Sequence, residues 1–516
     1  MTGDGLIFAV LLVGSVLLDR LARVRPPRLP GESPAAIDGK AVVGSGRRAL
    51  SSRSAYWAGL WLQAWMTTAL FGLLLALCGS IPVAAILALA MLALLVLSSN
   101  AKYALLGEPL LFSDLALIGA IFRHPQFYLS AVGIRQRIAV AAAAALLLAV
   151  IGRLFVPVLS PHLAGGALML AALAVLAISM RVRPWRDLAR LADADADVAC
   201  LGFAPTLLLY WQRWREGRDP PPCADVARQP PAAPPAFLVI VQCESFADPV
   251  ELFADPDLTL PGLAGARENA WQWGRLEVSG FGAYTMRTEY GVLFGRNEEE
   301  LGFRRYDPFL TASGEASYAL PARLRGWRSL FVHPHDMRFY GRDRIMPAGG
   351  FAQLVGEDRF APPAPGEGRY VTDAAVAKEV LALVGAGVAS GPRLVYAVTM
   401  ENHGPWAPDG SAGGHDLVPG YLRLVRHGDA MLTTLLEGLA ALAAQHERPA
   451  MLVFFGDHRP SIPGATAPGG DRHTPYVMMR LDAAGAFVRR GADARVDLTP
   501  AGLHHAMLEA VLGKVI

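Results

Sequence analysis

The chain has 516 residues, of which 53% are hydrophobic, and its formal net charge at pH 7 is +2. Its mean hydropathy of +0.33 is too high for a purely soluble enzyme, and its length exceeds that of one ordinary domain. A charge so close to neutral, without a dense basic run interleaved with aromatic residues, excludes nucleic acid as an expected partner.

The apolar residues are concentrated in the first third of the chain. A helix needs roughly 20 apolar residues to cross a bilayer, and several runs approach that length. These runs are Leu6–Leu18, Tyr56–Cys78, Ile81–Leu97, Ile138–Leu159 and Leu163–Met180. The first is short and bounded by Asp4 and Asp19, so it is a thin span, an interfacial helix or an uncleaved signal anchor; we count it as a span. The sequence predicts a transmembrane domain of about five helices over residues 1–182.

Two further segments combine apolar residues with charges and aromatic rings, which is typical of elements at a membrane surface. They are Leu105–Phe122 and Leu201–Trp214, and either could instead pack against the spans. A proline-rich stretch follows, which indicates a semi-rigid spacer. We therefore predict interfacial helices and a Pro-rich linker over residues 183–236.

Residues 237–516 show short apolar runs that alternate with helical stretches, which predicts an α/β domain with its own core. The strand-like runs are FLVIVQ, SLFVH, RLVYAVT, MLVFF and YVMM. Polar side chains follow four of them: Glu244, His333, His403, and the pair Asp457 and His458. Because ligands of open α/β sheets bind at the carboxyl ends of the parallel strands, these residues are expected to form one shared site.

Several short motifs occur in a fixed order in this domain. They are CESF at Cys243–Phe246, GAYTMRTEY at Gly282–Tyr290, HPHDMRFYGRD at His333–Asp343, MENHGPW at Met400–Trp406 and GDHRP at Gly456–Pro460. In this order they resemble the lipoteichoic acid synthase-like phosphoglycerol transferase family, proteobacterial type, within the alkaline phosphatase and sulfatase superfamily. The membrane region NAKY…GEPLLFSDLAL is similar to that family too. The resemblance implies an α-helical transmembrane N-terminal domain followed by an α/β sulfatase-like catalytic domain.

The resemblance also implies a metal centre and a nucleophile. Thr285 matches the family's catalytic threonine, and Glu244, Asp457 and His458 match its metal ligands. Coordination of a threonine hydroxyl to a divalent cation lowers its pKa and supplies an alkoxide. Two carboxylates and one imidazole suit a borderline cation, so we expect one Mn²⁺, with Mg²⁺ or Zn²⁺ as alternatives.

Four other residues match family positions that hold the glycerophosphate group: His333, Tyr340, Arg342 and His403. Arginine offers a planar fork to phosphate oxygens, and histidine can donate a hydrogen bond or move a proton. His403 is either the general acid or a phosphate contact, and the family often has tryptophan where this chain has Tyr340.

The remaining polar residues are assigned to structure. Glu289 is expected to orient the nucleophile loop, and His335 and His473 to be hydrogen-bonded structural residues. His427, His446, His504 and His505 are expected to be solvated. A Cys200–Cys223 disulfide and free thiols both agree with the cysteine spacing.

These residues predict a membrane transferase. Phosphatidylglycerol is the expected donor lipid, and the acceptor is an envelope glycan or a polyglycerolphosphate chain. The alternatives are a phosphoethanolamine transferase, which usually has several disulfides, a sulfatase or hydrolytic phosphodiesterase, and a non-catalytic scaffold. The sulfatase Cys-x-Pro-x-Arg signature is absent.

Charge distribution bears on the location of the catalytic domain. The family places it outside the cytoplasm, on the periplasmic face of the inner membrane, and we expect the same here. The segment after the first run is rich in basic residues, which favours a cytoplasmic location for that segment: Arg20, Arg23, Arg25, Arg28, Lys40, Arg47, Arg48 and Arg53. Four further crossings would return the catalytic domain to the cytoplasm, whereas an extra crossing near Leu105–Phe122 would place it outside.

Overall fold

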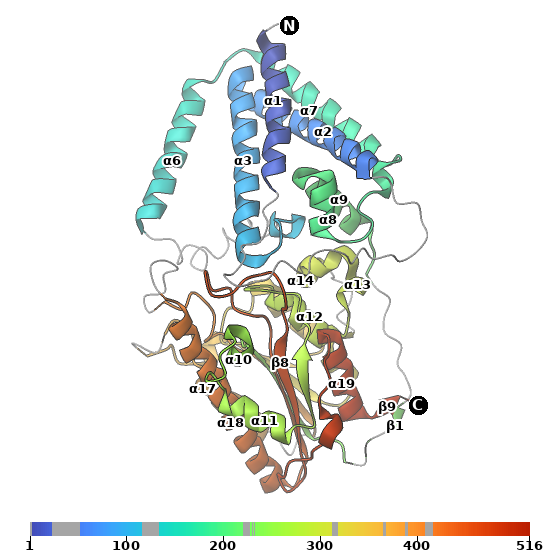
Figure 1. Ribbon diagram of the computed structural model, residues 1–516, viewed down its shortest axis with the longest axis vertical. Coiled ribbons are helices and arrows are strands. Elements are labelled where there is room, and N and C mark those ends of the chain that lie inside the picture. The colour runs from blue at the N-terminus through green and yellow to red at the C-terminus, as the bar shows by residue number, and fades with distance from the viewer. Residues whose placement is uncertain are drawn as a thin grey trace. The chain divides into compact units, whose positions relative to one another are not determined.

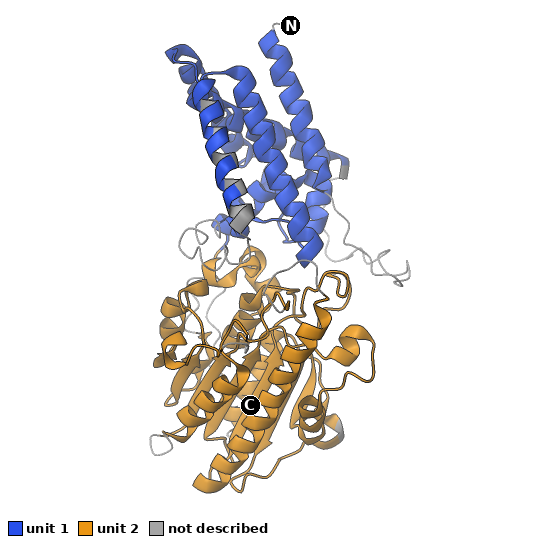
Figure 2. Cartoon of the chain, turned by 90° about the vertical axis from the view of Figure 1, so that its left-hand side faces the viewer, with its two compact units in different colours: residues 1–217 blue, residues 218–516 orange. Residues whose placement is uncertain are grey.

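The structure is a computed structural model, and it describes residues 3–22, 52–115, 134–219, 228–229, 231, 233–311, 318–364, 368–386, 391–407 and 416–515. The chain divides into two compact units, residues 1–217 and 218–516, coloured separately in Figure 2. Each unit has its own set of helices and its own core, so each is described by itself.

The first unit is entirely helical in its described part. Its α-helices, labelled in Figure 1, are α1 (Gly3–Leu21), α2 (Ser52–Cys78), α3 (Ile81–Leu106), α6 (Ile134–Arg153), α7 (Leu159–Ser179), α8 (Ala194–Leu201) and α9 (Phe203–Glu216). Among the described residues, three helical segments are long and apolar enough to cross a membrane: Arg53–Cys78, Ile81–Leu106 and Leu159–Ser179. The predicted spans Leu6–Leu18 and Ile138–Leu159 correspond to α1 and α6, which are not among these three.

Helix α9 packs inside the first unit. Its residue Leu209 is fully buried in a cluster with Leu62 of α2 and Leu176 of α7. This favours packing against the spans for Leu201–Trp214, although Trp211 keeps 42% of its surface exposed. The other predicted interfacial segment, Leu105–Phe122, lies partly outside the described residues.

The buried Asp19 at the end of α1 connects that helix to α9. Its carboxylate accepts hydrogen bonds from the backbone N–H groups of Phe203, at 3.1 Å, and Ala204, at 2.9 Å. The first N–H groups of a helix have no partner within the helix, so this side chain caps α9 from a distant part of the sequence. Gly202, at φ 101°, leaves room for the carboxylate, since a Cβ there would lie 2.4 Å from Asp19 Oδ2.

The second unit is built on a seven-stranded sheet with the order β3-β8-β7-β2-β6-β4-β5. The strands are β2 (Phe237–Cys243), β3 (Gln272–Leu276), β4 (Arg328–Val332), β5 (Gln353–Val355), β6 (Arg393–Val398), β7 (Ala450–Gly456) and β8 (Thr474–Leu481). Strands β7, β2, β6, β4 and β5 pair in parallel, and β8 pairs antiparallel with β7 and β3. A short separate pair joins β1 (Arg228–Gln229) to β9 (Lys514–Val515).

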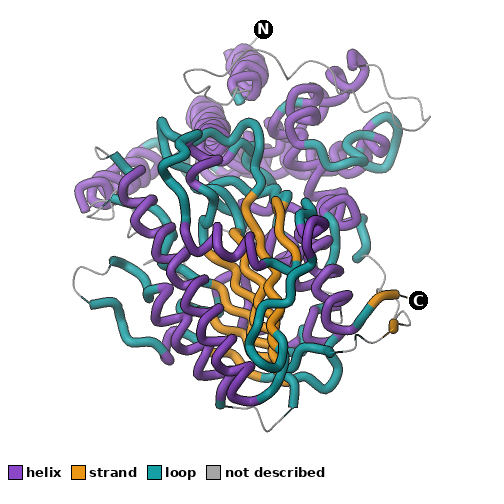
Figure 3. Tube along the Cα trace, turned by 60° about the horizontal axis from the view of Figure 1, so that its bottom comes forward, coloured by secondary structure: helices purple, strands orange, loops and turns teal. Residues whose placement is uncertain are grey.

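Helices cover the sheet, as Figure 3 shows for the strands in orange and the helices in purple. They are α10 (Pro249–Phe253), α11 (Pro261–Asn269), α12 (Thr285–Phe294), α13 (Glu298–Leu301), α14 (Pro308–Thr311), α15 (Leu320–Arg323), α16 (Arg342–Ala348), α17 (Asp373–Gly385), α18 (Val418–His446) and α19 (Pro500–Leu512). Central strands β2, β6 and β7 are buried along their whole length. This is why they appear in the sequence as continuous apolar runs rather than as alternating patterns.

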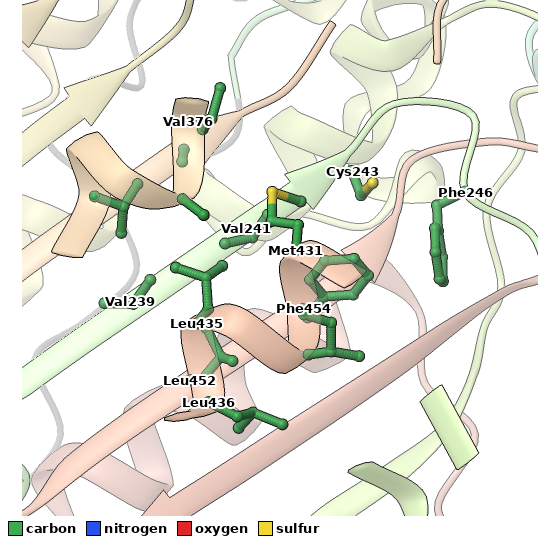
Figure 4. Packing of buried hydrophobic residues seen from close by; sticks show 14 of the residues in the cluster. Val239, Val241, Cys243, Phe246, Val376, Met431, Leu435, Leu436, Leu452 and Phe454 are labelled. Carbon is green, nitrogen blue, oxygen red and sulfur yellow. The ribbon is translucent and has the colours of Figure 1, made fainter. Parts of the chain in front are cut away.

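The core of the second unit lies between the central strands and α18. Figure 4 shows the β2 residues Val239 and Val241 in one cluster with Phe454 of β7 and with Met431 and Leu435 of α18. Burial of such aliphatic and aromatic side chains supplies most of the driving force for folding. It also holds the carboxyl ends of β2 and β7 side by side, where Cys243 pairs with Gly456.

Candidate active site

Three predicted metal ligands meet at the carboxyl ends of two neighbouring strands. Glu244 directly follows β2, and Asp457 and His458 directly follow β7. One ligand atom from each lies within 4.8 Å of the other two, and all three side chains are buried. The pairing of β2 with β7 therefore brings together residues that are more than 200 positions apart in the sequence.

The two oxygens of the Asp457 carboxylate differ in their hydrogen bonds. Its Oδ1 accepts hydrogen bonds from the backbone N–H groups of Ser245, at 2.8 Å, and His458, at 2.9 Å. Its Oδ2 is buried and has no hydrogen-bond partner among the described residues. Burial, followed by the nearby Glu244 carboxylate, raises the pKa of Asp457 to about 7. A buried carboxylate oxygen without a hydrogen-bond partner is suited to binding a cation.

The imidazole of His458 is oriented toward the same point. Its Nδ1 donates to the carbonyl oxygen of Arg459 at 3.2 Å, which leaves Nε2 as the atom that faces the cluster. Nε2 lies 3.5 Å from Glu244 Oε1 and 3.6 Å from Asp457 Oδ2. Burial lowers the pKa of His458, but the two carboxylates outweigh it and the net shift is upward.

These three side chains fit a divalent cation. Two carboxylates with one imidazole form a donor set for borderline cations, and the two negative charges would otherwise lie close together in a buried place. Ser245, which sequence reasoning did not single out, supports the set. Its hydroxyl donates to Glu244 Oε1 at 2.9 Å, and its φ of 50° turns the chain immediately after β2. Its place inside the CESF motif was the available signal.

Thr285 lies beside the ligand cluster. It is the first residue of α12, and its Oγ1 is 3.4 Å from His458 Nε2. Tyr284 precedes it with φ 76°, a left-handed conformation that ends the glycine-rich loop and starts the helix. The next turn is fixed by Thr288, whose hydroxyl donates to the carbonyl oxygen of Asp457 at 2.7 Å. Thr288 therefore connects α12 to a predicted metal ligand three residues after Thr285.

Two of the predicted substrate residues are in direct contact. Arg342 is 1% exposed, and its Nη1 donates to His333 Nε2 at 3.0 Å. The same guanidinium pairs with Glu289, and its carbon lies 5.2 Å from the centre of the Tyr340 ring. The structure thus brings Arg342, His333 and Tyr340 together with Glu289.

His403 lies on a partly exposed rim of aromatic and imidazole rings. Its Nδ1 is 2.8 Å from the carbonyl oxygen of Gly404, and its ring centre is 5.6 Å from that of Tyr370. Tyr370 in turn is 6.3 Å from His335, whose ring is 6.0 Å from that of His333. Tyr370, which sequence reasoning missed, carries no motif that would have revealed it.

One expectation for another residue was wrong. His504 is not solvated, because it is 1% exposed and its Nδ1 donates to the carbonyl oxygen of Val292 at 2.9 Å. His427 is exposed, as expected, and its Nδ1 lies 2.7 Å from Oε1 of the buried Glu401. Of the two cysteine alternatives, Cys200 is a free cysteine in the structure, and Cys223 lies outside the described residues.

The chain is similar in sequence to two proteins of one organism. The capsular polysaccharide biosynthesis protein RkpI of Rhizobium meliloti (strain 1021) is 30% identical over 438 residues, which cover 80% of this chain and 79% of that protein. A putative cyclic beta-1,2-glucan modification protein of the same organism is 26% identical over 244 residues, or 44% of this chain and 36% of that protein.

Two solved structures are among those that are similar to this chain. The phosphoglycerol transferase GacH of Streptococcus pyogenes, in complex with sn-glycerol-1-phosphate, has 17% identity and a TM-score of 0.43, and covers 55% of this chain and 76% of its own. The lipooligosaccharide phosphoethanolamine transferase A (EptA) of Neisseria meningitidis has 11% identity and a TM-score of 0.49, and covers 88% of this chain and 87% of its own.

The family assignment rests on the second unit. Residues 236–508, which include the seven-stranded sheet, Thr285 and the ligand cluster, match the sulfatase family over more than half of the chain. The chain therefore belongs to the sulfatase family, with a helical N-terminal unit that carries membrane-span candidates.

Proposed function

We propose that this protein is a membrane-anchored, metal-dependent phosphoglycerol transferase. It moves glycerophosphate from phosphatidylglycerol to an envelope glycan or a polyglycerolphosphate acceptor. The observation that carries the proposal is the position of Thr285, whose Oγ1 lies 3.4 Å from the Nε2 atom of a metal-ligand candidate, at the first turn of a helix. A hydroxyl held at a cluster of two carboxylates and an imidazole suits nucleophilic attack on a phosphodiester.

The first half-reaction transfers the glycerophosphoryl group to the protein. A divalent cation held by Glu244, Asp457 and His458, with Mn²⁺ as our candidate, would lower the pKa of the Thr285 hydroxyl and offset charge on the phosphoryl oxygens. Thr285 Oγ, after losing its proton to solvent, attacks the phosphorus atom, and the bond from phosphorus to the diacylglycerol oxygen breaks. His403 gives that oxygen a proton, so that diacylglycerol leaves as a neutral alcohol.

The second half-reaction regenerates the protein. An acceptor hydroxyl gives its proton to His403 and attacks the phosphorus atom, and the bond from phosphorus to Thr285 Oγ breaks. The free Thr285 is then ready for another donor. Throughout both steps Arg342 and Tyr340 provide hydrogen-bond donors for the glycerophosphate group. Burial raises the pKa of the Tyr340 hydroxyl, which therefore stays protonated and can donate.

The similar sequences and the helices support the proposed acceptor and location. A capsular polysaccharide biosynthesis protein and a glucan modification protein are among the similar sequences, which supports an envelope glycan over a polyglycerolphosphate chain. Three candidate spans support an inner-membrane location, with the second unit facing the periplasm. A lipid donor then never has to leave the bilayer surface.

The decisive experiment measures diacylglycerol release from labelled phosphatidylglycerol by the detergent-purified protein, with and without Mn²⁺. We expect metal-dependent release, and we expect Thr285→Ala to lower it by about 10³-fold or more because the nucleophile is gone. Thr434→Ala is the matched control, since Thr434 is an exposed threonine of α18 whose hydroxyl bonds only to the preceding turn.

Other outcomes separate the competing functions. Release of diacylglycerol from phosphatidylethanolamine, with no reaction of phosphatidylglycerol, would assign the protein to the phosphoethanolamine transferases. Turnover of a soluble sulfate or phosphate ester by water alone would make it a hydrolase. Release from phosphatidylglycerol that persists in Thr285→Ala would exclude the covalent route.

A further inference from the structure

A fully buried ion pair connects α12, the helix that carries Thr285, to Arg342, which the proposed function assigns to phosphate binding. The side chains of Glu289 and Arg342 are 0% and 2% exposed. Arg342 Nε donates to Glu289 Oε1 at 3.0 Å, and Arg342 Nη2 donates to Glu289 Oε2 at 2.5 Å. This side-by-side arrangement of two N–H groups on two carboxylate oxygens sets both the position and the plane of the guanidinium.

The hydrogen bonds of His333 indicate which of its ring nitrogens carries the hydrogen. His333 Nδ1 lies 3.1 Å from the carbonyl oxygen of Val398, and a carbonyl only accepts, so Nδ1 carries the hydrogen. His333 Nε2 is then a bare acceptor, and it takes the N–H of Arg342 Nη1 at 3.0 Å. Burial, followed by the charge of Arg342, lowers the pKa of His333 well below its usual value, in agreement with a neutral ring. In this arrangement His333 holds Arg342 rather than donating to a phosphate.

The pair also relates Arg342 to the nucleophile. Glu289 follows Thr285 by four residues in α12, and residues spaced by four lie on the same face of a helix. Arg342 is the first residue of α16, and His333 directly follows β4. A shift of α12 would therefore move Thr285 and, through Glu289, the guanidinium together.

The geometry leaves part of Arg342 for a ligand. A guanidinium has five N–H donors, and Glu289 and His333 take three of them in this structure. Two N–H groups on the Nη atoms are not used by these contacts. A rigid, charged donor at a fixed distance from the nucleophile is what a phosphoryl group needs, because orientation accounts for a large part of the rate of such reactions.

We infer that Glu289 is a positioning residue: it fixes the Arg342 guanidinium, with His333 on the other side, so that a phosphate group is held in line with Thr285. This inference rests on the proposed function, since it assigns Arg342 to the phosphate of the donor. It adds to that function a residue that contacts neither the metal ligands nor the substrate. It also changes the role of His333 from a substrate contact to a support of Arg342.

Two measurements on the detergent-purified, Mn²⁺-loaded protein test the inference. The first is the affinity for inorganic phosphate by calorimetry, and the second is kcat and KM for diacylglycerol release from phosphatidylglycerol. Glu289→Gln removes the charge that holds Arg342, and Glu289→Asp keeps the charge but shortens the side chain by one methylene. Glu379→Gln is the matched control, because Glu379 also pairs with an arginine, Arg359, at 3.1 Å but lies on α17, outside the site.

We expect Glu289→Gln to weaken phosphate binding by at least about tenfold and to lower kcat/KM by about 10²-fold, because a displaced donor no longer meets the phosphate. Mn²⁺ affinity should stay within about twofold of wild type, since Glu289 touches no ligand of the cluster. Glu289→Asp, which retains the buried charge pair and hence the fold, should show the same losses to a smaller extent. Glu379→Gln should match wild type in every measurement.

The result that would overturn the inference is wild-type phosphate affinity in Glu289→Asp, or in a folded Glu289→Gln variant. Equal losses of Mn²⁺ and phosphate binding would also overturn it, because they would show a general disturbance of the site. If wild-type protein binds phosphate but releases no diacylglycerol, the proposed donor is wrong while the phosphate measurement still decides the role of Glu289.

Discussion

Asp457 illustrates how much of the site a short motif reveals. An Asp-His pair after an apolar run indicates a ligand at a strand end, and in the structure both side chains turn into the Glu244 cluster. The motif does not reveal that Asp457 Oδ1 accepts hydrogen bonds from two backbone N–H groups while Oδ2 has no hydrogen-bond partner among the described residues. That asymmetry depends on the turn at Ser245, which comes from another strand.

The burial of His504 could not be predicted from the sequence. His504 and Val292 are far apart in sequence, and only the packing of α19 against α12 joins them through the hydrogen bond from His504 Nδ1. A histidine in a helical stretch with a mixed neighbourhood gives no signal of this burial, so the sequence led to a wrong expectation. The burial has a consequence for stability.

We predict that His504 makes the fold sensitive to acid. Burial lowers the pKa of His504 to about 3, whereas in the unfolded chain it is about 6.5. The folded state therefore binds fewer protons, so stability is complete above pH about 6.5 and is lost as the pH falls from there, at up to about 1.4 kcal/mol per pH unit. The measurement is the unfolding temperature of the purified protein at pH 7, 6 and 5.

Two variants identify the residue responsible. His504→Gln keeps a donor for Val292 but does not titrate, so its unfolding temperature should fall less between pH 7 and pH 5 than that of wild type. His446→Gln, near the end of α18, should behave as wild type. An unchanged acid response in His504→Gln would assign the effect to other groups. Burial is also the main reason why the pKa of His505 is lowered, so His505 acts in the same direction. The unfolding temperature of His504→Gln should therefore still fall somewhat between pH 7 and pH 5.

At the scale of the elements, apolar runs predicted the long strands of the sheet but not the short strands at its edges. Strands β2, β4, β6, β7 and β8 coincide with the predicted apolar runs. Strand β5 has only three residues and β3 alternates between buried and partly exposed positions, so neither forms a clear apolar run. Short edge elements are stabilised by the sheet they join, and this contribution is not written in their own sequence.

The contact between α1 and α9 gives a second prediction. Asp19→Ala removes the acceptor for the N–H groups of Phe203 and Ala204, which have no other partner in the first turn of α9. We expect a loss of about 1 kcal/mol of stability, as for a removed helix cap, and a lower unfolding temperature in detergent. Asp4→Ala, at the exposed start of the same helix, is the control and should change the unfolding temperature much less. Equal effects of the two substitutions would contradict the capping role.

At the scale of the whole molecule, the number of candidate spans bears on the conflict between the basic segment and the expected location of the catalytic domain. The three helices that are candidate spans all lie between positions 47 and 218. An odd number of crossings places these two positions on opposite sides of the membrane, so a cytoplasmic basic segment agrees with a periplasmic second unit. Four of the five spans predicted from the sequence lie between these positions, and an even number of crossings would leave both positions on the same side of the membrane.

We predict opposite accessibility of cysteines placed at positions 47 and 218, in a background that carries Cys200→Ser and Cys223→Ser, because Cys200 is exposed and Cys223 lies in the proline-rich segment next to position 218. A membrane-impermeant maleimide should label position 218 in right-side-out vesicles and position 47 in inverted vesicles. A cysteine at Glu437, an exposed position of α18, should follow position 218 because both belong to the second unit. Labelling of 47 and 218 from the same side would mean that another segment, such as α6, also crosses.

The sequence by itself determined the division into a helical apolar part and an α/β part, the main strands, and the residue types of the metal cluster. These depend on local composition, on hydrophobic runs and on short motifs, which a single chain displays directly. Only the tertiary structure decided that Glu289 pairs with Arg342, that His333 accepts from that arginine, and that Asp19 caps α9. Each of these is a contact between distant segments, and its geometry exists only after the chain has folded and excluded water from the polar groups involved.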